Sequence, residues 1–506
     1  MNEAKRGGVA RDVSLSSAET RRCQVLPPSF ACLASFGRLA NPKLSRYSKH
    51  EVPETIAEIL AAYRGGTATP ADIVARSFAR IRVHNDPAIF ITLRDKQDVL
   101  AEAQALMRSA DTALPLYGIP VAVKDNIDVA GLPTTAGCPA FGYDSDNDAA
   151  AVARLRAAGA LILGKTNLDQ FATGLVGVRT PYGIVRNPFD PKLIPGGSST
   201  GSAIAVAAGL APLALGTDTA GSGRVPAGFN NIVGLKPSRG MVSCAGVVPA
   251  CRMLDCVAIF ALTVDDAMTA LAAIAGADAA DPFSRPRPIA PVGPMPRGLK
   301  FGVPVAGDRL FFGDRIAAAA YDAALQRFAD LGAEITEIDI EPFYEAARLL
   351  YEGPWVAERY LVAKALIDSS PESLHPVTRR ILLAGAHRSA VDVFSAFYQL
   401  EDLRRVCDRI FRSIDALVLP TAPTIYTVEE VLADPIDLNS RLGTYTNFVN
   451  LLDLCGLAVP AVLRPDGIPF GVSLLAPAGQ DAALAAIGRQ FHATTGLPLG
   501  ALNLAR

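Results

Sequence analysis

The sequence predicts an α/β fold, in which a mixed central sheet is covered by helices on both faces within a single large domain. Short apolar segments of strand length alternate with helix-length segments along most of the chain. Half of the 506 residues are apolar and 19% are charged, so the chain can bury a large core. A helical region at about residues 341–414 is expected to form a cap over one side of the sheet.

The first half of this domain contains a clear helix start signal. Thr69-Pro70 places a threonine at the N-cap and a proline at the first helical position. Short apolar runs bounded by turn residues are typical of buried strands. Helices are therefore expected at residues 54–63, 70–82, 95–109 and 149–158, and strands at residues 88–93, 116–123 and 160–163.

A proline-rich passage at residues 281–296 indicates a linker or a long surface loop before the second half. Residues 1–50 lack apolar periodicity and are expected to form a disordered tail, which leaves residues 51–500 for the domain. Further strands are expected at residues 299–303, 333–340, 416–419 and 468–475, and helices at residues 315–331 and 481–492.

The segment at residues 195–226 has two glycine-serine loops, one on each side of an apolar run. The run at residues 203–215 consists mainly of small apolar residues, which suit a helix buried on all sides and a short strand at 212–215. Glycine allows the backbone to approach a ligand closely and to expose consecutive N–H groups. The two loops are therefore candidates for an oxyanion site.

Charge and cysteine content exclude several classes of partner and cofactor. The net charge of −2 gives no reason to expect a nucleic acid or an anionic membrane, and no apolar run reaches 18 residues. The eight cysteines show no CxxC pairs and no metal-ligand spacing, which favours buried thiols in a reducing compartment. We therefore expect a cytoplasmic protein with no metal site and no cofactor.

A hydrolytic serine in these loops would need a group that accepts its proton. None of the five histidines lies near the loops in sequence, and there is no GxSxG elbow, so a serine–histidine–acid triad is disfavoured. Lys124 ends an apolar strand, where burial would lower the pKa of its amine and favour the neutral form. Taken alone, such a lysine is more often a solvated strand end, and serines in glycine loops are more often turn residues.

Three motifs, in this order along the chain, resemble the amidase signature family. Residues 118–125 (GIPVAVKD) resemble its lysine motif, residues 195–199 (PGGSS) its first serine loop and residues 216–222 (GTDTAGS) its nucleophile loop. The resemblance covers about residues 119–240 and extends more weakly to about residue 496. It implies the amidase fold and hydrolysis of an amide C–N bond.

The resemblance also implies a Ser–cisSer–Lys triad. Ser222 would attack the amide carbonyl to give an acyl-enzyme, and Ser198 would pass the proton on to Lys124. The family holds the bridging serine after a cis peptide bond, which here would be Gly197-Ser198.

An oxyanion hole made of backbone N–H groups is part of the same resemblance. The residues expected to form it are Thr219, Ala220, Gly221 and Ser222. Thr200 and Ala220 stand where many family members have glycine. Neither departure removes a catalytic group.

Several positions resemble the allophanate hydrolase branch of this family. Gly223 stands where most relatives have isoleucine, and residues 248–256 and 443–450 are similar to that branch. There, a tyrosine and an arginine eight residues apart hold the substrate carboxylate, a pattern that Tyr351 and Arg359 match. This spacing is near two helical turns, so both side chains are expected on one helix face. Without the resemblance, Tyr351 would be a packing residue and Arg359 would pair with a surface acid.

The resemblance implies an amidohydrolase of urea degradation and nitrogen metabolism, which deaminates allophanate to N-carboxycarbamate and ammonia. The expected partner is a small carboxylated amide. Full-length allophanate hydrolases usually carry a further C-terminal domain that this chain is expected to lack, so decarboxylation would be spontaneous or left to a separate protein. An amidase for another small amide, an amidase-like subunit of a tRNA-dependent amidotransferase, and a homodimer are left open.

Overall fold

The computed structural model of the protein describes residues 54–109 and 111–501, so the predicted tail at residues 1–50 lies outside the described residues. Its strands are β1 (Phe90–Leu93), β2 (Pro120–Lys124), β3 (Pro133–Thr134), β4 (Tyr143–Asp144), β5 (Leu161–Thr166), β6 (Leu213–Asp218), β7 (Val233–Lys236), β8 (Cys256–Ala261), β9 (Lys300–Pro304), β10 (Glu334–Ile338), β11 (Ala416–Pro420), β12 (Leu454–Leu463) and β13 (Pro469–Pro477).

In the described part of the chain, 11 strands form one sheet in the order β1-β5-β2-β6-β8-β7-β12-β13-β11-β9-β10, while β3 pairs with β4. Strand β2 is parallel to both β5 and β6, and β9 is parallel to both β10 and β11. The other neighbours in the large sheet are antiparallel. The predicted mixed sheet is therefore confirmed.

The helices begin at the predicted signals. Thr55 and Thr69 each form a capping box at the start of a helix, and Pro70 is the first helical residue after Thr69. The α-helices are α1 (Ile56–Arg64), α2 (Pro70–His84), α3 (Lys96–Ser109), α4 (Ala150–Ala157), α5 (Thr200–Ala207), α6 (Val225–Phe229), α7 (Val264–Ile274), α8 (Arg315–Asp330), α9 (Glu341–Glu352), α10 (Trp355–Ser369), α11 (Pro376–Gly385), α12 (Ala390–Phe411), α13 (Val428–Ala433), α14 (Asp437–Leu442), α15 (Phe448–Leu451) and α16 (Asp481–Thr495).

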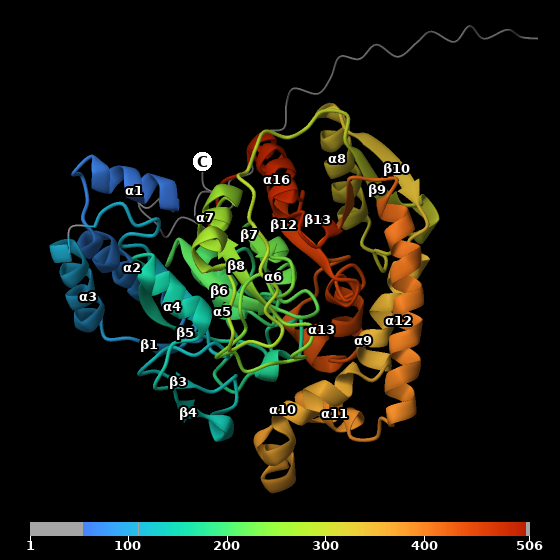
Figure 1. Cartoon of the computed structure of the whole chain (residues 1–506), viewed down its shortest axis with the longest axis horizontal. Coiled ribbons are helices and arrows are strands. Elements are labelled where there is room, and N and C mark those ends of the chain that lie inside the picture. Colours follow the sequence, from blue (N-terminus) through green and yellow to red (C-terminus); the bar gives the residue numbers. More distant parts are fainter. Residues whose placement is uncertain (1–53, 110, 502–506) are drawn as a thin grey trace, which may run out of the picture. The chain divides into compact units, whose positions relative to one another are not determined.

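Successive residues of a central strand pack on opposite faces of the sheet, as the two-residue period of a strand requires. Val121 and Val123 of β2 belong to a core cluster that includes side chains of α4, α7 and α16. Ala122, between them, belongs to a separate cluster that includes α3 and α5. Helices therefore cover both faces of the sheet, as predicted (Figure 1).

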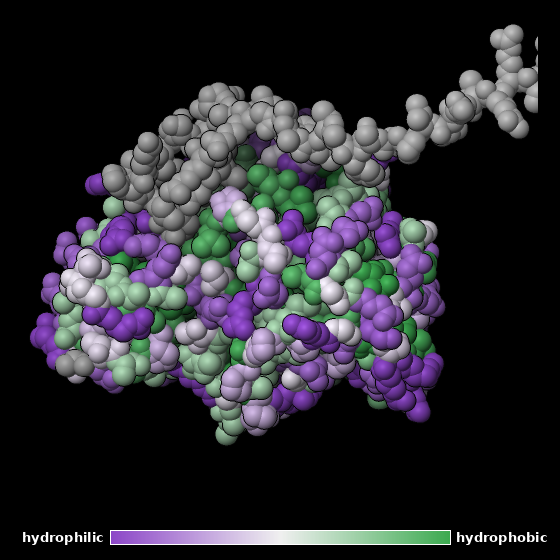
Figure 2. All heavy atoms as spheres, turned by 90° about the horizontal axis from the view of Figure 1, so that it is seen from above, coloured by the Kyte–Doolittle hydropathy of each residue, from purple (hydrophilic) through white to green (hydrophobic). Residues whose placement is uncertain are grey.

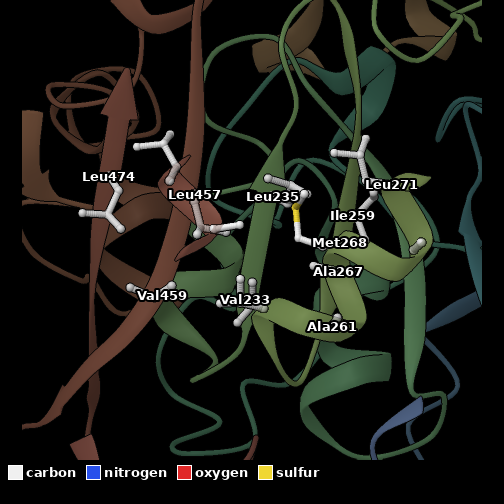
Figure 3. Packing of buried hydrophobic residues seen from close by; sticks show 14 of the residues in the cluster. Val233, Leu235, Ile259, Ala261, Ala267, Met268, Leu271, Leu457, Val459 and Leu474 are labelled. Atoms are coloured by element: carbon white, nitrogen blue, oxygen red, sulfur yellow. The ribbon is translucent and has the colours of Figure 1, made fainter. Parts of the chain in front are cut away.

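The larger of these clusters is shown from close by in Figure 3. Leu235 of β7 and Ile259 of β8 are register partners, and Met268 and Leu271 of α7 lie over them. Leu457 of β12 continues the same layer. Burial of such apolar surface stabilises the fold by roughly 25 cal/mol per Å².

Helix α5 is buried along its whole length, as the small apolar residues of this segment predict. Its close packing depends on Gly201, because a Cβ atom there would collide with the carbonyl oxygen of Ile89. The helix begins at Thr200, directly after the first serine loop, and β6 leads from it to the second loop. This short connection brings the two loops to the same region of the fold.

Helices α9 to α12 occupy the segment for which a cap is predicted. Phe343 and Leu350 of α9 belong to the same core cluster as Leu417 and Leu419 of β11. Side chains of α12 belong to this cluster as well, and α12 lies beside α9 in Figure 1. These helices therefore pack on the part of the sheet formed by the C-terminal half of the chain.

Strand β12 was not predicted, although it lies inside the sheet between β7 and β13. Gly456 and Pro460 interrupt its apolar sequence, and both residue types disfavour a central strand. The structure accommodates Pro460 at an irregularity, because the register with β13 shifts between Pro460 and Val462.

The surface seen from above Figure 1 carries hydrophilic residues interspersed with apolar ones (Figure 2). Among residues 54–109 and 111–501, the helices are too short or too polar to cross a lipid bilayer.

Candidate active site

Lys124 is the last residue of β2 and is completely buried. Its Nζ lies 2.8 Å from Ser198 Oγ and 2.7 Å from Thr217 Oγ1. Burial lowers the pKa of the Lys124 amine to about 7. The nearby carboxylates that oppose this shift are Asp169, Asp255 and Asp218. Near neutral pH a large fraction of this amine is therefore neutral and able to accept a proton.

Ser198 lies in the first glycine-serine loop, and the peptide bond Gly197-Ser198 is cis, as expected. The Asp169 amide donates to the Ser198 carbonyl at 3.1 Å, and the Gly197 amide donates to the Leu175 carbonyl at 2.9 Å. A Cβ atom on Gly197 would collide with the Asp169 carboxylate, which itself accepts the Gly177 amide at 3.0 Å. The surroundings of the loop therefore require glycine directly before Ser198.

Ser222 lies in the turn that follows β6, and the side chain of Asp218 holds this turn. Its carboxylate accepts the amides of Gly221 at 2.8 Å and Gly223 at 3.0 Å. It also accepts Nε and Nη2 of Arg224 at 2.9 and 3.0 Å in a pair that is completely buried. Burial alone would raise the pKa of Asp218, but Arg224 holds that pKa below its ordinary value.

The two loops meet at Thr217, which precedes the nucleophile turn. Its hydroxyl accepts from Lys124, and its carbonyl accepts the Ser199 hydroxyl at 3.0 Å. The structure therefore brings Lys124 and Ser198 into direct contact. Among the described residues, the Ser222 hydroxyl makes no hydrogen bond to either of them.

The backbone of the nucleophile turn presents several free N–H groups. Within the described chain, the amides of Thr219, Ala220 and Ser222 have no acceptor, whereas the Gly221 amide is bound to Asp218. The Thr446 hydroxyl donates to the Ala220 carbonyl at 2.7 Å. Gly221 has a φ of +124°, and a Cβ atom there would collide with Thr446. The turn is thus fixed from the side of residues 443–450.

Tyr351 and Arg359 do meet, but they do not share one helix as expected. Tyr351 lies in α9 and Arg359 in α10, and the chain leaves the helical path at Gly353 and Pro354. Pro354 lacks an N–H and disfavours a helical residue before it, which separates the two helices. The guanidinium carbon of Arg359 nevertheless lies 5.2 Å from the centroid of the Tyr351 ring.

Arg359 is only 2% exposed, so the alternative of a surface ion pair is wrong. Its Nη1 donates to Thr173 Oγ1 at 3.1 Å and to the Ala172 carbonyl at 3.4 Å, while its Nε has no partner. No carboxylate of the described residues forms an ion pair with it. A buried guanidinium with unused donors is suited to bind an anionic group of a ligand.

Several residues that support these loops were not identified from the sequence. Asn126 donates to Thr217 Oγ1 at 3.3 Å and to the Val248 carbonyl at 3.1 Å. Asn450 donates to the carbonyls of Asp218 and Leu254, both at 2.8 Å. Polar residues within otherwise apolar segments were the available signal. Over the described ranges, His, Cys, Asp and Glu form no group of three that could hold a metal ion.

Comparison with known proteins agrees with this geometry. The Amidase family model matches residues 72–485. The urea amidolyase of Saccharomyces cerevisiae is 47% identical over 406 residues, which is 79% of this chain but only 22% of that protein. The amidase-type subunit of the glutamyl-tRNA(Gln) amidotransferase of Symbiobacterium thermophilum is 35% identical over 477 residues, covering 87% of this chain and 96% of that protein. The solved structure of Kluyveromyces lactis allophanate hydrolase has a TM-score of 0.84 at 40% identity, covering 90% of this chain and 75% of that chain.

Proposed function

Because this chain belongs to the amidase family, we propose that it hydrolyses the terminal amide bond of allophanate and releases ammonia. The observation that carries the substrate assignment is the buried guanidinium of Arg359, which has no carboxylate partner in the described chain and stacks on Tyr351. Similarity to a urea amidolyase and to an allophanate hydrolase supports the same assignment.

In the proposed reaction, Ser222 Oγ attacks the amide carbonyl carbon of the substrate. Its proton passes to Ser198, and Ser198 passes its own proton to the neutral amine of Lys124. The 2.8 Å contact between Lys124 and Ser198 and the lowered pKa of Lys124 support this transfer. The proton then returns to the leaving nitrogen, the C–N bond breaks, and ammonia departs. Water hydrolyses the acyl-enzyme by the reverse path.

The negative oxygen of the tetrahedral intermediate is proposed to bind backbone N–H groups of the nucleophile turn. The free amides of Thr219, Ala220 and Ser222 support this proposal. Gly221 was predicted to contribute as well, but its amide is engaged by Asp218. Its proposed role is therefore to give the turn its shape, with a φ that disfavours a side chain.

The substrate carboxylate is proposed to bind Arg359, with Tyr351 beside it. A planar guanidinium matches a carboxylate with two parallel hydrogen bonds, and burial strengthens such bonds. The first product is then N-carboxycarbamate, whose decarboxylation is spontaneous or assisted by a separate protein. No nucleic-acid partner is proposed.

We propose a single amidase domain at residues 51–500, with residues 341–414 as a helical cap. The described cysteines are free thiols, which supports a cytoplasmic location. A homodimer is left open.

A second candidate function is that of the amidase component in a tRNA-dependent amidotransferase. It is favoured by the 35% identity to the glutamyl-tRNA(Gln) amidotransferase component of Symbiobacterium thermophilum, along 96% of that protein. Such a component would bind partner chains that supply the RNA contacts. Co-purification with those chains, together with a lack of allophanate turnover, would favour this second function.

The test is ammonia release by the purified chain from allophanate, with malonamate, biuret and a simple aliphatic amide alongside. We expect strong preference for allophanate. Ser222→Ala should abolish release, whereas Ser202→Ala, a buried serine that bonds the Leu215 carbonyl at 2.8 Å, should retain it. Turnover of a neutral amide without turnover of allophanate would refute the substrate assignment but leave the amidase chemistry in place.

A further inference from the structure

Asp255 is a buried carboxylate directly before β8, and the triad does not use it. It is 5% exposed, and among the described residues it forms no ion pair. Its oxygens accept the amides of Ala250 at 2.8 Å and Cys251 at 3.2 Å, together with the hydroxyl of Thr219. Three donors thus converge on one carboxylate, and each belongs to a segment beside the candidate active site.

One of these segments is the nucleophile turn. Thr219 is the first residue after β6, it lies three residues before Ser222, and its backbone N–H is free. Because the Thr219 hydroxyl is bound to Asp255, the side chain of Thr219 cannot rotate freely. The direction of its N–H is therefore fixed relative to Ser222.

The other segment lies beside the proposed carboxylate site. The Cys251 thiol lies 3.7 Å from the Trp355 carbonyl, one turn before Arg359 on α10. The charge of Arg359 also acts on both Cys251 and Asp255. Asp255 therefore connects the turn that carries the nucleophile with the loop that packs against the arginine.

We propose that Asp255 is a positioning residue, which holds the nucleophile turn through the Thr219 hydroxyl at a fixed place relative to Arg359. This inference rests on the proposed function insofar as Ser222 is the nucleophile. It does not depend on which amide is the substrate.

The charge of Asp255 provides a readout that a merely structural role would not affect. The groups facing Lys124 are the carboxylates of Asp169, Asp255 and Asp218, which raise the pKa of Lys124, and Arg359, which lowers it. Glu358 and Arg359 face Asp255 from α10, and Cys251 lies beside it. Removing the negative charge of Asp255 should therefore lower the pKa of Lys124.

The experiment measures the rate at which a fluorophosphonate labels Ser222 as a function of pH, together with kcat and KM for allophanate. We expect Asp255→Asn to slow labelling and kcat about tenfold or more and to move the rising limb of the pH profile to lower pH. Thr219→Val should slow both rates and leave the limb in place. Because the two changes break the same hydrogen bond, the rates of the double variant should not be the product of the two effects.

The matched control is Asp266→Asn, which removes another buried carboxylate. Asp266 lies on α7, where backbone amides of residues Ile56 and Ala57 bind it, and its replacement should leave rates and limb unchanged. Wild-type rates and limb position in both Asp255→Asn and Thr219→Val would overturn the inference. Labelling of the wild type without allophanate turnover would instead refute the proposed substrate while leaving this test intact.

Discussion

The amine of Lys124 lies 2.8 Å from the hydroxyl of Ser198, although 74 residues separate them in the chain. The sheet explains this contact. Lys124 ends β2, and β6, which is parallel to β2, ends beside it at Asp218. Because parallel neighbours end at the same edge of a sheet, the buried lysine and the turn after β6 lie at one edge.

The pH dependence of activity should follow the Lys124 amine. Burial lowers its pKa to about 7, and only the neutral amine accepts a proton from Ser198. Ammonia release and fluorophosphonate labelling of Ser222 should therefore be slow in acid and rise as the pH increases through about 7. A rate that is constant from about pH 5.5 to about pH 8.5 would contradict lysine as the base.

Lys124→Met should abolish activity and raise the free energy of unfolding. The pKa of this lysine is about 7 in the folded state and 10.5 in its ordinary state, so the unfolded chain binds more protons between these values. Wild-type stability therefore increases as pH rises from about 7 toward 10.5, and the advantage of the methionine variant is largest below about pH 7. Urea denaturation at several pH values measures this.

Lys165→Met is the control for that change. Lys165 is equally buried, but its amine lies 3.3 Å from the Asp125 carboxylate. Removing one partner of a buried pair leaves the other charge unpaired, which should destabilise the fold by about 3–5 kcal/mol. If both lysine variants lose stability alike, the amine of Lys124 is not under a desolvation penalty.

Arg359→Met should act on carboxylated substrates. Loss of a charged hydrogen-bonding partner should lower kcat/KM for allophanate by about tenfold to a hundredfold, since such bonds contribute about 1.5–3 kcal/mol. Turnover of a neutral amide should change little. The control is Arg179→Met, because Arg179 is also buried but donates to the carbonyls of Thr173 and Pro435. Equal losses for both substrate classes in Arg359→Met would argue against carboxylate binding.

Arg224→Met should disrupt the nucleophile turn. It leaves the completely buried carboxylate of Asp218 without its cation, and we expect a loss of about 3–5 kcal/mol in unfolding free energy together with lower kcat. As a comparison, Lys364→Ala removes the exposed pair with Asp368 and should cost at most about 0.5 kcal/mol. Thermal unfolding and ammonia release report the two effects. Unchanged stability in Arg224→Met would show that the amides of the turn suffice to hold Asp218.

Local features of the fold were predictable because local chemistry decides them. Thr69 and Pro70 start α2 as expected, since a side-chain oxygen and a missing N–H both suit a helix N-terminus. Helix α5 is buried on all sides because its residues are small and apolar. Strand β12 escaped prediction because its irregularity at Pro460 is compensated by pairing with a distant strand.

The sequence by itself determined the family, the order of the three motifs and the alternation that builds a mixed α/β sheet. The tertiary structure decided which polar groups meet. Tyr351 and Arg359 contact each other from two helices, and Asp255 binds Thr219 across 36 residues. Such contacts depend on how whole elements pack, whereas propensities and motifs act over a few neighbouring residues. The pKa of Lys124 likewise depends on burial by distant segments, so only the folded chain sets it.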